Sequence, residues 1–174
     1  MIGKKNLIEN LKKEFPKRNV HAFPRVEKIV VNVGCGKVTS DPKYIEKISR
    51  DLKIITGQTP VETKAKKAIS GFKIRKNLPI GLKVTLRGKR MEDFLARLIN
   101  ITFPRIRDFR GIKKSAVTAE GNINIGIREQ TVFPEIKHDQ VEKVFSLQIN
   151  IVTTAKTSRD AQKLLRAYGA VFEK

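Results

Sequence analysis

The spacing of apolar residues along the chain predicts four amphipathic helices. In each, apolar side chains recur three and four positions apart, which places them on one helical face. Pro16 and Pro104 are expected to end the first and third helices, and Gly57 and Gly169 to follow the second and fourth. The predicted helices cover residues 4–15, 42–56, about 91–102 and 158–168.

Strict alternation of apolar and polar residues predicts four strands, at residues 26–33, 82–87, 123–127 and 145–151. In the first of them Ile29, Val31 and Val33 point to one side, while Asn32 points to the other. A short extended piece is expected at residues 59–63. Residues 105–119 show neither period and are expected to form a long irregular loop.

Half-buried strands mixed with helices are typical of an α+β fold. We expect a mostly antiparallel sheet with helices packed on one face, which leaves the other face and the adjoining loops free to bind a partner. The sequence shows no internal repeat, low-complexity segment or linker. Residues 1–174 are therefore expected to form a single RNA-binding domain, for the reasons that follow.

The charge of the chain points to a polyanionic partner. It carries 37 basic and 17 acidic residues, a formal net charge of +20, and 40% of its residues are hydrophobic. The apolar content is sufficient for a folded core, but so large a charge repels itself unless a polyanion neutralises it. Nucleic acid is the leading candidate, followed by an anionic membrane surface.

Cysteine content and hydropathy indicate a cytoplasmic protein. Cys35 is the only cysteine, so no internal disulfide can form, and a reducing compartment is expected. No apolar run approaches the roughly 18 residues that a membrane span requires. The polar N-terminus also lacks the apolar centre of a signal peptide.

No pattern in the sequence supports catalysis or a metal site. His21 and His138 are isolated, and Cys35 has no metal-ligating neighbour at the usual spacings. Gly34-Cys35-Gly36-Lys37 follows a strand as a phosphate-binding loop would, but it lacks the GxxxxGK[ST] spacing and is better explained as a tight turn. We therefore expect no enzyme activity, no cofactor and no bound metal.

Basic residues are concentrated between Glu62 and Arg90, where ten cations face one acid. A merely solvated surface would mix both signs, so this concentration favours contact with phosphates. The cations are Lys64, Lys66, Lys67, Lys73, Arg75, Lys76, Lys83, Arg87, Lys89 and Arg90.

An aromatic residue and a polar strand face accompany these cations. Phe72 lies among glycines and cations, where it could stack on an unpaired base, although a place in the core is equally compatible with the sequence. Lys83, Thr85 and Arg87 alternate on one face of their strand and offer donors to phosphates and 2′-hydroxyls. Asn32 could join this face from the first strand.

A second basic cluster lies in the predicted loop after the third helix. Loops of this length are usually functional or mobile. Because the loop also contains apolar residues, we expect it to dock on RNA or on a protein. Its cations are Arg105, Arg107, Arg110, Lys113 and Lys114, and its apolar residues are Ile106, Phe109 and Ile112.

Seven motifs in collinear order resemble the bacterial family of ribosomal large-subunit protein five, over nearly the whole chain. The chain begins directly with its first predicted helix and lacks the short aromatic-containing lead of many members. The motifs are Pro24–Gly34 (PRVEKIVVNVG), Gly71–Arg75 (GFKIR), Pro79–Gly88 (PIGLKVTLRG), Phe103–Gly111 (FPRIRDFRG), Gly126–Gln130 (GIREQ), Phe133–Glu135 (FPE) and Thr153–Lys156 (TTAK).

The resemblance implies a non-catalytic protein that binds 5S ribosomal RNA in the central protuberance. The family's RNA-recognising positions correspond to Asn32, Gln58, Phe72 and Thr85, which the cations Lys64, Lys66, Lys67, Lys83 and Arg87 would assist. The loop with Lys73, Arg75 and Lys76 would approach the elbow of the P-site tRNA. The loop with Arg107, Arg110 and Lys113 would contact a small-subunit head protein in an intersubunit bridge.

Further expected partners are 23S ribosomal RNA and other 5S-associated proteins, with no membrane partner and no homo-oligomer. A non-ribosomal RNA chaperone or RNA-processing factor is the alternative reading of the same basic sheet. Binding to a membrane surface is less well supported, because the charge lies on strands and loops rather than on a basic amphipathic helix.

Overall fold

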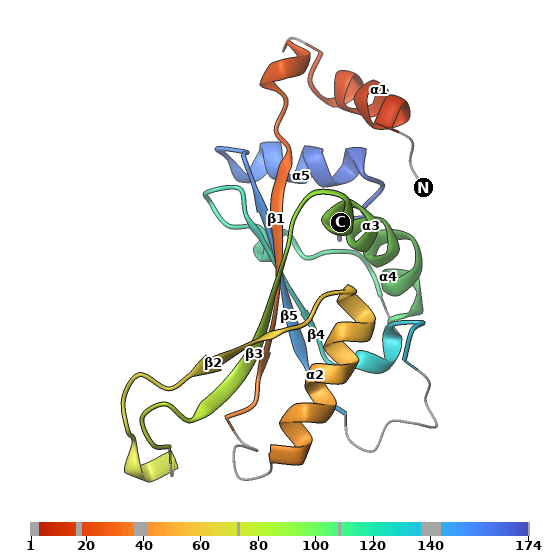
Figure 1. The fold of residues 1–174 in the computed structure, drawn as a ribbon. Coiled ribbons are helices and arrows are strands. Elements are labelled where there is room, and N and C mark those ends of the chain that lie inside the picture. The colour runs from red at the N-terminus through yellow and green to blue at the C-terminus, as the bar shows by residue number, and fades with distance from the viewer. Residues whose placement is uncertain are drawn as a thin grey trace. The chain divides into compact units, whose positions relative to one another are not determined.

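The chain folds around a five-stranded antiparallel sheet with the strand order β2-β3-β1-β5-β4 (Figure 1). The computed structural model describes residues 4–16, 19–36, 42–72, 74–107, 109–136 and 144–173. The strands are β1 (Val26–Gly34), β2 (Val61–Lys64), β3 (Pro79–Leu86), β4 (Ile123–Ile127) and β5 (Leu147–Thr153). The helices are α1 (Lys4–Glu14), α2 (Pro42–Thr56), α3 (Gly88–Arg97), the short α4 (Phe103–Arg105) and α5 (Ser158–Ala167).

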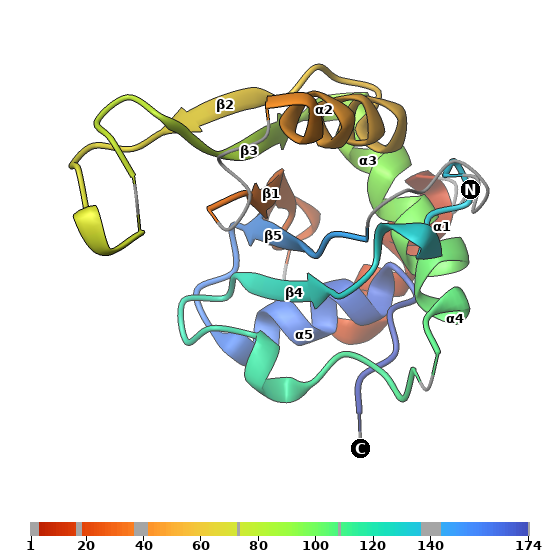
Figure 2. The same cartoon turned by 90° about the horizontal axis from the view of Figure 1, so that it is seen from below.

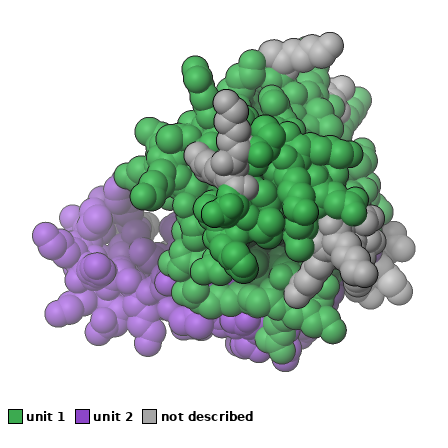
Figure 3. All heavy atoms as spheres, turned by 90° about the horizontal axis from the view of Figure 1, so that it is seen from above, with its two compact units in different colours: residues 1–29, 87–125, 150–174 green, residues 30–86, 126–149 purple. Residues whose placement is uncertain are grey.

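The chain divides into two compact units (Figure 3). Unit 1 contains residues 1–29, 87–125 and 150–174, and unit 2 contains residues 30–86 and 126–149. Strands β1, β4 and β5 contribute residues to both units. The expectation of one RNA-binding domain stays a prediction.

The core of unit 2 forms where α2 meets β3. One face of α2 is apolar at helical spacing, so burying that face removes it from water and stabilises the unit. The same holds for alternate residues of β3, whose side chains leave the other strand face for polar groups. The buried residues are Ile45, Ile48, Leu52 and Ile55 from α2 and Leu82, Val84 and Leu86 from β3.

Unit 1 packs α1 against α5 and buries the apolar side of the helix that begins at Gly88. The Thr157 side chain caps α5 by accepting a hydrogen bond of 3.2 Å from the backbone N–H of Asp160. Phe15, at the end of α1, lies 5.9 Å from the Phe23 ring and 5.4 Å from the Lys163 ammonium. The contact between Phe15 and Lys163 joins the end of the N-terminal helix to α5.

The predicted α+β class and antiparallel sheet are confirmed, and the alternation in β1 is as expected. Ile29, Val31 and Val33 are at most 1% exposed, whereas Asn32 is half-buried. The extended piece predicted at residues 59–63 is strand β2. That the remaining sheet face binds RNA stays a prediction.

The predicted end of the third helix at Pro104 is wrong. The helix begins three residues early, at Gly88, widens into a π-helical turn at Leu98–Thr102 and continues as α4 through Pro104. The π-helical turn directly precedes Pro104, and the missing N–H of the proline interrupts the hydrogen-bond ladder there without ending the helix.

The predicted irregular loop at residues 105–119 is partly ordered. It contains a 3-10 turn at Lys114–Ala116, and Ile112 and Val117 form isolated bridges with Phe172 and Ile123. Both of these apolar residues are buried. The partner of Ile112 lies 60 positions along the chain, so no local period in the sequence could indicate that bridge.

Candidate RNA-binding surface

The β2–β3 hairpin is an ordered arm that extends beyond the two strands. Val61 pairs with Lys83 at its open end, and Lys64 pairs with Pro79 at the other. Further on, the Ala65 N–H donates to the Leu78 carbonyl at 2.9 Å. Figures 1 and 2 show the loop at the closed end projecting away from α2. Residues 65–78, called the hairpin loop below, are therefore presented on a hydrogen-bonded support.

The hairpin loop folds back on itself around Phe72. Ile69 and Ile74 exchange two backbone hydrogen bonds, of 2.9 and 3.1 Å, and the Phe72 N–H donates to the Ile69 carbonyl at 3.3 Å. Asn77 takes the left-handed conformation, with φ +68°, that returns the chain to β3. The Phe72 side chain is 73% exposed, which excludes its place in the core of this chain.

Exposed cations lie along the same hairpin as Phe72. None of them forms an ion pair within the part of the chain that the structure describes. Their charges are therefore available to a polyanion at no cost of breaking an internal pair. They are Lys64, Lys66, Lys67, Arg75 and Lys76, while Lys73 lies outside the described residues.

Four other predicted residues, Gln58, Lys83, Thr85 and Asn32, form a polar group that begins at the open end of the hairpin. The Gln58 side chain, just after α2, donates from Nε2 to the Thr85 carbonyl at 3.3 Å. Lys83 and Thr85 alternate with the buried residues of β3, and Asn32 alternates with those of β1, so all three belong to the side of the sheet away from the buried residues. Lys83 is exposed, and the amide and hydroxyl residues are half-buried.

The turn after α2 fixes the position of Gln58. Thr56 is 3% exposed, and its hydroxyl donates to the Leu52 carbonyl at 2.6 Å. The same hydroxyl oxygen accepts from the Gln58 N–H at 3.3 Å, and Gly57 has φ +68°. Sequence reasoning missed this role of Thr56, although a threonine beside the helix-ending glycine could have indicated it.

The predicted residues thus fall into separate groups. Phe72 and its cations occupy the closed end of the hairpin, and Gln58, Lys83 and Thr85 its open end, all within unit 2. Arg87 belongs to unit 1, as do Arg107, Arg110 and Lys113. The Arg87 guanidinium lies 4.0 Å from the carboxylate of Glu27, a partner that the sequence did not indicate. Both side chains are more than half exposed, so this pair contributes little to stability.

Two apolar side chains on the hairpin were also missed. Val61 is 64% exposed opposite Lys83, and Ile69 is 49% exposed near Phe72. Val61 adds apolar surface at the open end of the hairpin, and Ile69 adds it beside Phe72 at the closed end.

Neither the buried cysteine nor a cluster of metal-ligating side chains provides a further site in the part of the chain that the structure describes. Burial raises the pKa of the Cys35 thiol, which opposes formation of a thiolate. Within the described residues there is no group of three or more His, Cys, Asp or Glu side chains that could hold a metal ion. No helix in that part of the chain has the length and apolar character needed to cross a membrane.

Comparison with known proteins assigns the family. A family model described as ribosomal protein L5 matches residues 19–75, and a second model, described as the C-terminus of the same ribosomal family, matches residues 79–172. Proteins named large ribosomal subunit protein uL5 are similar over almost their whole length. The relative from Halothermothrix orenii is 52% identical, over 97% of this chain and 94% of its own.

Two more relatives of that name agree with this assignment. The one from Syntrophomonas wolfei is 47% identical over 97% of this chain and 95% of its own length. The one from Thermosipho melanesiensis is 49% identical over 98% and 93%. With both family models matched and this identity over the full length, the chain belongs to the ribosomal protein L5 family, a family of structural rather than enzymatic ribosomal proteins.

Proposed function

We propose that this protein is a structural constituent of the large ribosomal subunit that binds 5S ribosomal RNA through unit 2 and helps fix it in the central protuberance of the cytoplasmic ribosome. The family membership supports the ribosomal assignment. The observation that carries the RNA contact is Phe72, whose ring is 73% exposed among cations on an ordered hairpin. Together with the neighbouring exposed Ile69, the ring presents apolar surface that a partner would cover.

The two ends of the hairpin would contribute differently to binding. Lys66, Lys67 and their neighbours would neutralise phosphates, which gives affinity without reading sequence. The Phe72 ring would stack on an unpaired base. Asn32 and Thr85 would hydrogen-bond to 2′-hydroxyls or base edges, because amides and hydroxyls both donate and accept.

Gln58 is suited to the same task. The bond from Nε2 to the Thr85 carbonyl uses one amide hydrogen and leaves the second hydrogen and Oε1 for RNA. Because that bond also fixes the amide orientation, less side-chain entropy is lost on binding. The open end of the hairpin would therefore recognise a specific local RNA shape.

The wider assembly follows from the family resemblance. Arg75 and Lys76 of the hairpin loop are exposed and would approach the elbow of the P-site tRNA. The basic loop of unit 1 would be a second contact, for RNA or for a small-subunit head protein. The 23S ribosomal RNA and other 5S-associated proteins complete the proposed set of partners.

The test is binding of the purified chain to 5S ribosomal RNA and to an unrelated RNA of equal length, across a salt series. We expect a preference for 5S that persists as salt rises, because hydrogen bonds and stacking are screened less than phosphate contacts. Equal binding of both RNAs that collapses with salt would favour an RNA chaperone and refute the proposal.

A matched pair of variants locates the contact. Changing Lys66 and Lys67 to Gln should lower the slope of log Kd against log salt by about 0.7 to 0.9 for each phosphate lost. Changing Lys12 and Lys13 of α1 to Gln removes the same charge from exposed positions in unit 1 and should leave the slope unchanged. An equal effect in both variants would show that only total charge matters.

A further inference from the structure

The turn after α2 holds the backbone and the side chain of Gln58 at the same time. The Gln58 N–H donates to the Thr56 hydroxyl oxygen at 3.3 Å, and its side chain donates from Nε2 to the Thr85 carbonyl at 3.3 Å. Gly57, between the two residues, has the left-handed φ of +68° that turns the chain out of the helix. The amide of Gln58 therefore has a defined orientation before any ligand binds.

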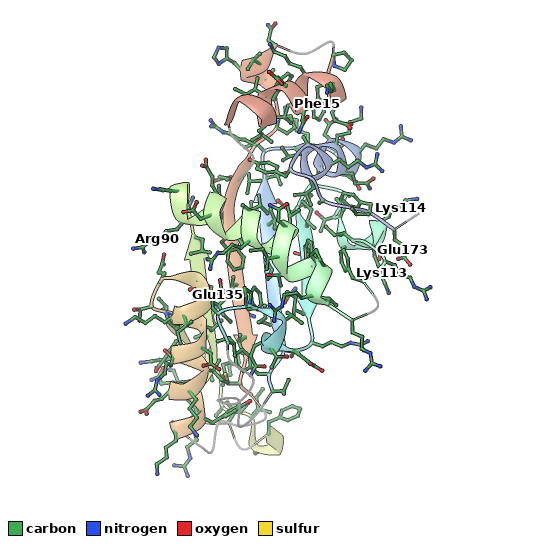
Figure 4. All side chains as sticks on the ribbon, turned by 90° about the vertical axis from the view of Figure 1, so that its right-hand side faces the viewer. Phe15, Arg90, Lys113, Lys114, Glu135 and Glu173 are labelled. Carbon is green, nitrogen blue, oxygen red and sulfur yellow. The ribbon has the colours of Figure 1, made fainter. Side chains whose placement is uncertain are left out.

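Both anchors of this amide belong to packed elements. Thr56 is 3% exposed and donates its hydroxyl hydrogen to the carbonyl of Leu52, which is fully buried, at 2.6 Å. The helix α2 packs against β3, the strand that carries Thr85, and Figure 4 shows their side chains filling the space between them. Because the turn and the Thr85 carbonyl are fixed by the same packing, the amide of Gln58 loses little side-chain entropy on binding.

The bond to Thr85 leaves a definite set of groups for a ligand. A glutamine amide has two N–H donors and one carbonyl acceptor, and the Thr85 carbonyl takes one of the donors. Gln58 is half-buried and forms no further side-chain hydrogen bond with the described residues. One N–H donor and the Oε1 acceptor remain, and both come from a single rigid amide plane.

Among the bases, adenine matches one donor and one acceptor at its N6–N7 edge. Its N6 amino group donates and its N7 accepts, so that a glutamine amide binds both atoms. Guanine presents two acceptors, O6 and N7, at the same edge, and one of them would face Oε1 without a hydrogen. The amide left by the Thr85 bond thus favours adenine over guanine at this edge.

We propose that Gln58 reads an unpaired adenine of the bound RNA through N6 and N7, and that Thr56 is the positioning residue for this contact. The adenine is unpaired because the corresponding edge of a base in an RNA helix lies in a groove that side chains cannot enter. This inference rests on the proposed function for the RNA and adds the base that is read and the residue that aims the reader.

The first experiment uses the full-length chain and 5S transcripts in which single adenosines are replaced by 7-deaza-adenosine, which has a C–H in place of N7. At one adenosine this replacement should weaken binding of the wild type but leave binding of Gln58→Ala unchanged. Gln58→Ala should bind the unmodified RNA about 5- to 150-fold more weakly. Replacement of guanosines by 7-deaza-guanosine is the matched control, and its effects should be the same in both proteins.

A second set of variants separates positioning from stability. Thr56→Val keeps the shape of the side chain but removes the hydroxyl, so it should weaken 5S binding, and Thr56→Ser, which keeps the hydroxyl, should restore it. In the double variant Thr56→Val with Gln58→Ala, the losses should not add, because both act through one contact. A merely structural threonine would give additive losses and would weaken binding of an unrelated RNA equally.

The glycine of the turn offers a matched pair that leaves Thr56 intact. A Cβ at Gly57 would meet no atom within 4 Å, so any substitution there is limited only by the backbone conformation. Gly57→Ala should strain the left-handed turn and weaken discrimination between 5S and unrelated RNA, while Gly57→Asn, which tolerates this conformation better, should retain more of it. This pair decides the role of the turn even if Thr56→Val unfolds the protein.

The proposal is overturned if Gln58→Ala abolishes the effect of 7-deaza substitution at no adenosine, or at a guanosine instead. Binding of unstructured oligoadenylate and oligouridylate separates it from the proposed function. A preference for oligoadenylate that disappears in Gln58→Ala, in a chain that does not prefer 5S, would refute the proposed function alone. Preference for 5S without any adenine effect would refute only the reading of adenine by Gln58.

Discussion

Replacing Phe72 by Ala removes the most exposed ring described in the hairpin loop without opening the core. The side chain is 73% exposed, so its removal deletes almost no buried contact and should change the free energy of unfolding by less than about 0.5 kcal/mol. Its backbone bond to Ile69 does not depend on the side chain. Stacking of a base on an aromatic ring contributes about 1–3 kcal/mol, so the Kd for RNA should rise about 5- to 150-fold.

The assay combines 5S binding at fixed salt with urea denaturation of the same samples. Phe72→Leu is the first control: it keeps an apolar side chain but has no ring, so it should stay weak if stacking is the interaction. Ile69→Ala is the second, since it removes an exposed apolar residue of the same loop. Unchanged affinity in Phe72→Ala, or full affinity in Phe72→Leu, would refute the stacking argument.

Further predictions concern the core of unit 2. Gln130→Leu should lower the free energy of unfolding by about 1–3 kcal/mol in urea, because the buried Phe145 N–H loses the Gln130 Oε1 acceptor 2.8 Å away. Gly81→Ala should cost about 1–3 kcal/mol, since its Cβ would lie 2.8 Å from the Val33 carbonyl oxygen, whereas Gly34→Ala, with open space around it, should cost less. Burial raises the pKa of the Cys35 thiol above its ordinary 9.0, so the stability that the neutral thiol contributes is complete below pH 9.0 and is lost as pH rises. Urea denaturation in an alkaline series should therefore show the wild type losing stability relative to Cys35→Ala; parallel curves would contradict this.

The sequence by itself determined the element types, the fold class and the family. Alternation in β1 and helical spacing in α2 are local, and burial of one face follows directly from them. The sequence also showed that cations concentrate in the β2–β3 hairpin. Because almost no acids are interleaved with them, few internal ion-pair partners are available, and contact with phosphates is favoured.

Tertiary structure decided what depends on partners distant in the chain. A ring among glycines and cations carries no period, so only the fold could show that Phe72 is exposed. Gln58 meets the Thr85 carbonyl 27 positions away, and no local pattern encodes that bond. Ile112 and Phe172 pair across an even longer separation, which turns an apparent loop into a fixed surface. Side-chain type and local period fix which faces are apolar, but only packing fixes which of those faces remain exposed to a partner.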